Sequence, residues 1–153
     1  MKLTSDDGKA EVEIVRNDDA DPYSGYWIGL KIQTVDGEYS GANGCVHFSE
    51  FNRFLTHFSE FIRTRQGDVT LTMTEDCRLD FFRWNNKADV GVRATIAKLT
   101  MGHESMRMTP AMITGTFKLA SEFMNTIEHD FMRMKENEPP AAVPGRDGAG
   151  LMR

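Results

Sequence analysis

The stretch FSEFNRFLTHFSEFIRTRQGDVTLTM, residues 48–73, changes its hydrophobic periodicity once, and this change decides the fold. After Gly67 the apolar residues Val69, Leu71 and Met73 fall at every second position, which is the period of a strand. The stretch therefore predicts a helix that ends near Arg65 and a strand that follows at once. Before Gly67, large apolar side chains recur at the spacing of one helix face, namely Phe51, Phe54, Leu55, Phe58, Phe61 and Ile62.

The apolar face of this helix indicates what the helix does. Its aromatic rings must leave water, and each one contributes about 1.5–3 kcal/mol when it is fully buried. We expect Ser49 to cap the N-terminus and Gly67 to take the left-handed conformation after the last turn. Since no reactive group is mounted on the helix, we interpret it as hydrophobic filling for a sheet.

Three strands are predicted before the helix. Apolar residues alternate with polar ones in AEVEIVR (10–16) and in YWIGLKIQTV (26–35). The dipeptide Asp36-Gly37 is a strong hairpin signal, because both central positions of a type I′ turn need a positive φ. The return strand is EYSGANGCVHF (38–48).

Three more strands and a second helix are predicted after the strand that begins at Val69. The strands are RLDFFRW (78–84), VGVRATIAKLT (90–100) and the methionine-rich ESMRMTPAM (104–112). The helix is expected over residues 116–135. Its apolar stripe consists of Phe117, Ala120, Met124, Ile127 and either Phe131 or Met134.

The predicted fold class is α+β, as one domain over residues 11–135. About seven strands in the order β-β-β-α-β-β-β-β-α are joined by short turns, which favours a largely antiparallel sheet with both amphipathic helices packed on it. We expect residues 1–10 to be frayed. The tail 136–153 is rich in proline and glycine, and we expect it to be disordered.

Composition narrows the range of functions. The 153 residues carry a net charge of -5, which argues against nucleic-acid binding and is compatible with a basic protein partner. The start of the chain has no apolar export signal, and no run is long enough to span a membrane. The chain has only two cysteines, which suits a reducing compartment. We therefore expect a cytoplasmic protein that does not act on membranes.

The sequence contains no recognisable catalytic, cofactor or metal motif. The four histidines lack ligand spacing, and neither a phosphate loop nor a nucleophile elbow occurs. We therefore predict no catalytic residues, no metal ligands and no cofactor. Two acidic turns and one tryptophan at a strand end are instead the candidate partner-binding residues: Asp18, Asp19, Asp21, Glu75, Asp76 and Trp84.

The order of these elements resembles one known family. Trp27 in a strand, the DGEYSG turn (36–41), the Phe-rich helix, DVTLTMTE (68–75), VGVRATI (90–96) and a final amphipathic helix are similar to the WapI-type immunity proteins of bacterial polymorphic toxin systems. The resemblance covers roughly residues 11–135. It implies a cytoplasmic protein that binds and blocks a toxin domain by occlusion, and it brings no catalytic residues with it.

The sequence leaves two functions open besides that of an immunity protein. The chain is either a non-catalytic immunity protein with a protein partner, for example a basic toxin domain, or a small-molecule-binding or regulatory α+β domain of unknown ligand. An enzyme whose residues converge only in space is the third reading. A deep pocket lined by polar groups would favour the small-molecule reading.

Overall fold

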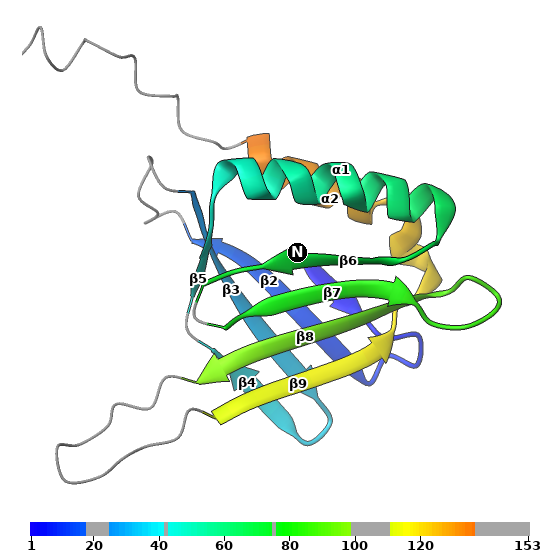
Figure 1. The fold of residues 1–153 in the computed structure, drawn as a ribbon. Helices are drawn as coiled ribbons and strands as arrows, with labels where there is room; N and C mark the ends of the chain where they lie inside the picture. Colours follow the sequence, from blue (N-terminus) through cyan, green and yellow to red (C-terminus); the bar gives the residue numbers. More distant parts are fainter. Residues whose placement is uncertain (18–24, 42, 75, 99–110, 137–153) are drawn as a thin grey trace, which may run out of the picture.

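The computed structural model describes residues 1–17, 25–41, 43–74, 76–98 and 111–136. Figure 1 shows two antiparallel sheets below a pair of helices. The predicted α+β class is confirmed, but the strands form two sheets where one was expected. Short turns indicated which consecutive strands pair with each other. No local pattern in the sequence indicates whether the strands before the first helix join the edge of the strands after it.

The first sheet contains the N-terminal strands in the order β1-β2-β3-β4, and β5 pairs with the other end of β3. The predicted return strand is thus two short strands, which pair with different halves of β3. The strands are β1 (Lys2–Thr4), β2 (Ala10–Asn17), β3 (Tyr26–Thr34), β4 (Gly37–Ser40) and β5 (Gly44–Val46).

The second sheet follows the first helix and has the order β6-β7-β8-β9. Each strand pairs antiparallel with the next. The methionine-rich strand predicted over 104–112 lies mostly outside the described residues, and β9 begins only at Ala111. The strands are β6 (Asp68–Thr72), β7 (Arg78–Arg83), β8 (Val90–Lys98) and β9 (Ala111–Lys118).

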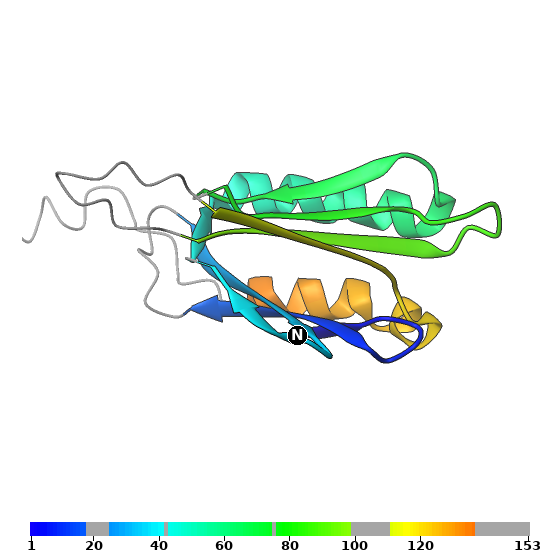
Figure 2. The same ribbon diagram turned by 90° about the horizontal axis from the view of Figure 1, so that it is seen from below.

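The two sheets lie in separate layers that face each other, as Figure 2 shows. At one end the layers are joined by the backbone N–H of Thr74, which donates to the carbonyl oxygen of Cys45 at 3.0 Å. A bridge between Ser5 and Leu119 joins them elsewhere. The apolar residues of both sheets point into one shared core between the layers.

Helix α1 (Phe48–Thr64) and helix α2 (Ile127–Glu136) close one side of this core. The predicted stripe is buried at Phe51, Phe54, Leu55, Phe58 and Phe61. The ring of Phe58 lies 4.8 Å from that of Phe81 in β7 and 5.1 Å from that of Phe131 in α2. The helix therefore buries its predicted apolar face, as expected of hydrophobic filling for a sheet, and it covers one side of a core that two sheets share.

The ends of α1 differ from the prediction. His47 is the N-cap residue and makes no side-chain cap hydrogen bond, whereas Ser49 already lies inside the helix. Gly67 takes the predicted left-handed conformation, with a φ of 75°, but the residue that caps the last turn is Arg65, which has a φ of 56° and donates its N–H to the carbonyl oxygen of Phe61. Arg65 tolerates this conformation because its guanidinium also hydrogen-bonds the carbonyl oxygens of Ile62 and Ala88.

Two further expectations are wrong. The N-terminus is not frayed over its first residues, since β1 pairs with β2 and Leu3 is fully buried. The second helix does not begin at residue 116, because Phe117 belongs to β9 and a 3₁₀ turn (Ser121–Asn125) precedes α2. Phe117 fits the stripe of a helix and the inner side of a strand equally well, so its spacing alone misled the prediction. The tail 137–153 lies outside the described residues.

Candidate partner-binding surface

Trp84 follows directly after β7 and is the most exposed aromatic side chain of the second sheet, at 42%. Its ring lies 6.1 Å from the ring of Phe82, two residues earlier on the same side of the strand. The adjacent strand offers glycine at the position paired with Phe82, namely Gly91. A Cβ atom there would stand 2.5 Å from the Phe82 ring and 2.9 Å from Trp84. The glycine therefore lets both rings lie against the backbone of β8.

A charged cluster continues from this aromatic pair across the same outer side of the sheet. The Arg93 guanidinium lies 4.9 Å above the centre of the Phe82 ring. Arg93 also reaches the Asp80 carboxylate at 4.0 Å, and Arg78 Nε approaches it at 3.2 Å. Asp80 accepts a further hydrogen bond of 2.7 Å from the Thr70 hydroxyl. We call the surface made of Thr70, Arg78, Asp80, Phe82, Trp84 and Arg93 the arginine–aromatic face.

The charges on this face are unequally exposed. The Asp80 side chain is 9% exposed, while the side chains of Arg78 and Arg93 are 50% and 41% exposed. The Asp80 carboxylate is thus mostly buried and pairs with both guanidiniums. The surface offered to solvent is cationic, although the chain as a whole is acidic.

The turn that carries Trp84 is held by its own hydrogen bonds. Trp84 N–H donates to the Asp89 carbonyl oxygen at 2.7 Å. The Asn85 side chain donates to the Asp89 carboxylate at 2.7 Å and accepts from the N–H groups of Lys87 and Asp89. The Asn85 hydrogen bond is the main cause that lowers the pKa of Asp89, with Lys118 assisting.

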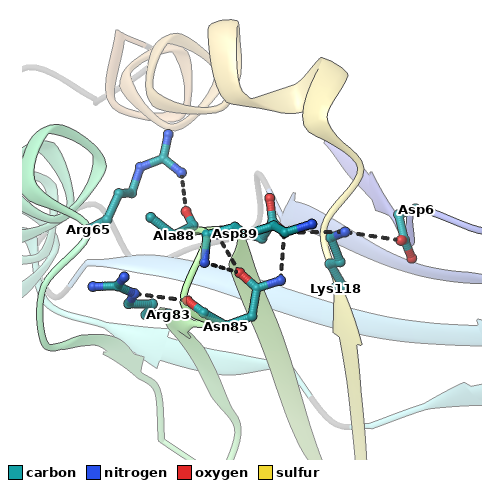
Figure 3. Close-up of polar contacts among 8 residues, drawn as sticks. Asp6, Arg65, Arg83, Asn85, Ala88, Asp89 and Lys118 are labelled. Carbon is teal, nitrogen blue, oxygen red and sulfur yellow. Dashed lines mark hydrogen bonds and ion pairs between the residues drawn. The ribbon is translucent and has the colours of Figure 1, made fainter.

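Three elements far apart in the sequence brace this turn, as Figure 3 shows. Arg65 at the end of α1 donates to the Ala88 carbonyl oxygen at 3.0 Å. Lys118 at the end of β9 lies 3.3 Å from the Asp89 carboxylate and 3.5 Å from Asp6. The Asp89 carboxylate raises the pKa of Lys118. Trp84 therefore follows β7 on a turn that contacts from α1 and β9 restrain, and such restraint reduces the entropy lost when a partner binds.

The structure separates the predicted site residues. Asp76, an exposed residue with a φ of 55°, stands before β7, whereas Trp84 stands after it. The six residues of β7 lie between them and span roughly 20 Å at about 3.3 Å per residue. Asp18, Asp19, Asp21 and Glu75 lie outside the described residues.

The described residues that flank the two acidic segments do lie together. Asn17 pairs with Trp27, and Trp27 pairs with Cys45. Cys45 in turn exchanges hydrogen bonds with Thr74, at 2.7 and 3.0 Å. We call the region made of Asn17, Trp27, Cys45, Thr74 and Asp76 the acidic end. It lies away from Trp84, at the opposite end of β7.

Sequence reasoning singled out Trp84 as a candidate, which stays a prediction, and did not single out the charged residues beside it. Arg93 was not singled out because its meeting with Asp80 depends on strand register. Arg78 lies two residues before Asp80 on the same strand, so alternation alone places these two side chains on one side. The usable signal was the alternation of β7, which already placed Phe82 and Trp84 on one side. The pairing partner was beyond reach because register is fixed by long-range packing.

Other sites are poorly supported among the described residues. No group of three His, Cys, Asp or Glu side chains there is placed to hold a metal ion. None of the described helices has the length and apolar character to cross a membrane. A groove of about 870 Å³ runs between α1 and α2 past Leu55, His129 and Met132, and it is open to solvent. Enclosed small-molecule sites bury most of their ligand, which this groove does not.

Comparison with known proteins gives one positive finding. The model of the immunity protein WapI-like family matches residues 2–130. The chain belongs to the WapI-like immunity protein family. The match extends from β1 to α2, so it includes both sheets, the arginine–aromatic face and α1. No curated protein and no solved structure matched the chain.

Membership of the immunity family implies a protein partner, which would bind an exposed surface of the chain. An immunity protein acts in general on a protein partner, so an exposed, preorganised surface is the feature to look for. The arginine–aromatic face has the residue types, Trp and Arg, that carry most binding energy at protein interfaces. Among the described residues of the acidic end, Asp76 is the one that carries a negative charge.

Proposed function

We propose that this chain is a cytoplasmic bacterial immunity protein that neutralises a cognate toxin domain by binding and occluding it, without turning over a substrate. The observation that carries the proposal is the family match over residues 2–130. It is supported by the part of the fold that the structure describes, where no three metal-ligating side chains converge and where one outer surface is held by its own contacts. Function then lies on the surface of a rigid platform.

The toxin domain is proposed to be basic overall. The chain has a net charge of -5, and opposite charges accelerate association over distances of about one Debye length. The acidic residues Asp18, Asp19, Asp21, Glu75 and Asp76 would provide this attraction. Their role is proposed to be in the rate of encounter, since rim charges change association more than final affinity.

The test is co-expression with the polymorphic toxin domain encoded beside the gene for this chain. We expect the wild-type chain to restore growth and to co-elute with that toxin domain as a stable complex. A toxin domain from an unrelated locus is the control and is expected to remain toxic. Absence of both protection and complex formation would reject the immunity function.

A stoichiometry series separates occlusion from enzymatic inactivation. Toxin activity is measured in vitro while the amount of the chain is increased. Occlusion predicts that inhibition reaches completion only at molar equivalence. Complete inhibition by a small fraction of an equivalent would show that each molecule inactivates many toxin molecules, which contradicts a non-catalytic mechanism.

A further inference from the structure

We infer that the arginine–aromatic face binds a carboxylate-bearing segment of the toxin domain, with Trp84 as the apolar anchor. This inference rests on the proposed function, since it names the contact chemistry of the same complex. It assigns to the second sheet the main binding energy, and it leaves long-range attraction to the acidic end. The partner segment is acidic even where the toxin domain as a whole is basic.

Charge complementarity is the first argument for an acidic segment. Arg78 and Arg93 share the single carboxylate of Asp80, and Asp80 contacts Arg78 through Nε. Each guanidinium has five N–H donors, so the outward-facing nitrogens retain capacity for a second carboxylate. A bidentate contact with a carboxylate is the geometry that a guanidinium favours.

A third guanidinium extends the cationic surface beside Trp84. Arg83 lies exposed at the end of β7 and donates to the carbonyl oxygens of Asn85 and Asn86, at 2.9 and 2.8 Å. These neutral acceptors fix the side chain but leave its charge in place. Asp68, the exposed carboxylate on the adjacent strand, offsets only part of the total. The face therefore has a local surplus of positive charge.

Preorganisation is the second argument. Gly91 lets Phe82 and Trp84 lie against β8, and the braced turn holds Trp84 from behind. Arg93 is held between the Phe82 ring and Asp80. These side chains lose little rotamer freedom on binding, which is the condition under which aromatic and arginine residues become hot spots.

Nucleic acid is the competing occupant, because arginines and exposed rings also bind single strands. The acidic charge of the whole chain opposes it, since binding a polyanion requires a basic footprint. Family membership also favours a protein partner. The arginine–aromatic face is therefore assigned to protein carboxylates.

The first test is the affinity of the toxin domain for matched variants. Trp84→Ala is expected to weaken the complex about 30-fold, the size of a hot-spot residue. Arg78→Gln is expected to weaken the complex mainly by faster dissociation, because the guanidinium contacts the partner carboxylate directly. Lys31→Gln removes one exposed positive charge from the first sheet and is expected to bind like the wild type.

The second test identifies the partner group directly. A carbodiimide couples a lysine amine to a carboxylate with loss of water. The Arg78→Lys variant should therefore form an amide between position 78 and an Asp or Glu of the toxin domain, detectable by mass spectrometry. Lys31, an exposed native amine on the first sheet, should form none with the toxin. The crosslink needs no loss of affinity, so it stands even if Trp84→Ala does not fold.

The outcomes separate this inference from the proposed function. Failure of the wild-type chain to bind the toxin domain rejects the immunity function itself. Wild-type binding with unchanged affinity in Trp84→Ala and no adduct at position 78 overturns the inference and keeps the function. Binding of a single-stranded RNA oligonucleotide that depends on Arg78 and Trp84 would overturn it in favour of nucleic acid.

Discussion

The two sheets share one core, yet their outer faces are built differently. On the first sheet, charges pair across neighbouring strands near the surface, as Lys2 with Glu11 at 3.8 Å and Lys31 with Glu38 at 3.5 Å. On the second, two arginines converge on one buried carboxylate beside an exposed tryptophan. Exposed pairs add about 0–1 kcal/mol and keep a surface soluble. An arginine–aromatic cluster on a braced support is instead typical of a binding site.

This difference separates what stabilises the fold from what binds a partner. The buried inner residues of the two sheets are of the same type, since both sheets turn apolar side chains to the core. The outer residues distinguish one sheet from the other. Substitutions inside should therefore affect both sheets together, and substitutions outside should affect one face alone.

The strongest break comes from the shared core. Phe58→Ala should lower the free energy of unfolding by about 3–5 kcal/mol, because it empties the contact of α1 with Phe81 and Phe131. Denaturant titration measures the loss, and both sheets should unfold in one transition. A loss below about 1 kcal/mol would show that α1 does not fill the core.

A second break tests whether the N-terminal strand belongs to the core. Leu3 is fully buried, and the N-terminal amine donates to the Ile14 carbonyl oxygen at 3.0 Å. Leu3→Ala should cost about 2–5 kcal/mol. The exposed neighbour Lys2→Ala is the control, expected to stay within about 0.5 kcal/mol. Equal effects of the two substitutions would support the frayed terminus that composition predicts.

Asp80 sharpens the comparison on the outer side. Asp80→Ala should cost about 1–3 kcal/mol, because Thr70 loses its acceptor and the two arginines lose their common anion. Asp68→Ala, at an exposed position on the adjacent strand, serves as the matched control with little change expected. If both variants unfold at the same denaturant concentration, the Asp80 carboxylate does not stabilise the arginine–aromatic face.

The turn below Trp84 predicts a pH effect. The folded-state pKa of Asp89 lies below its ordinary value because of Asn85 and Lys118. Its stabilising contribution is therefore complete above about pH 4 and is lost as the pH falls through the folded pKa. Urea titrations of Asp89→Asn should show a shallower loss of stability in acid than the wild type. An identical acid profile would remove Asp89 from the brace.

The smallest effect is expected at the C-terminus. Removing residues 138–153 should shift the melting temperature by less than about 2 °C, because a proline- and glycine-rich tail buries too little surface to order itself. Differential scanning calorimetry of the full and shortened chains decides this. A larger decrease would mean that the tail packs on one of the faces compared here.

The sequence predicted α1, most strands and the outward side of β7 that carries Trp84, because each depends on a local period. It failed where two periods overlap, as at Phe117, and where a short apolar strand such as β1 has too few residues to show a pattern. The split into two sheets and the meeting of Asp80 with Arg93 depend on register and layer packing. Such contacts between distant residues leave no periodic trace in the chain.

The two tryptophans stand on the two surfaces compared: Trp84 on the arginine–aromatic face and Trp27 at the acidic end. The most direct measurement is ¹⁹F NMR of the chain labelled with 5-fluorotryptophan, which gives one signal for each. Trp27→Phe and Trp84→Phe assign the signals, and the toxin domain is added unlabelled. We expect the Trp84 signal to shift and broaden in the complex while the Trp27 signal changes little. A complex in which only the Trp27 signal moves would place the toxin at the acidic end and contradict binding by the second sheet.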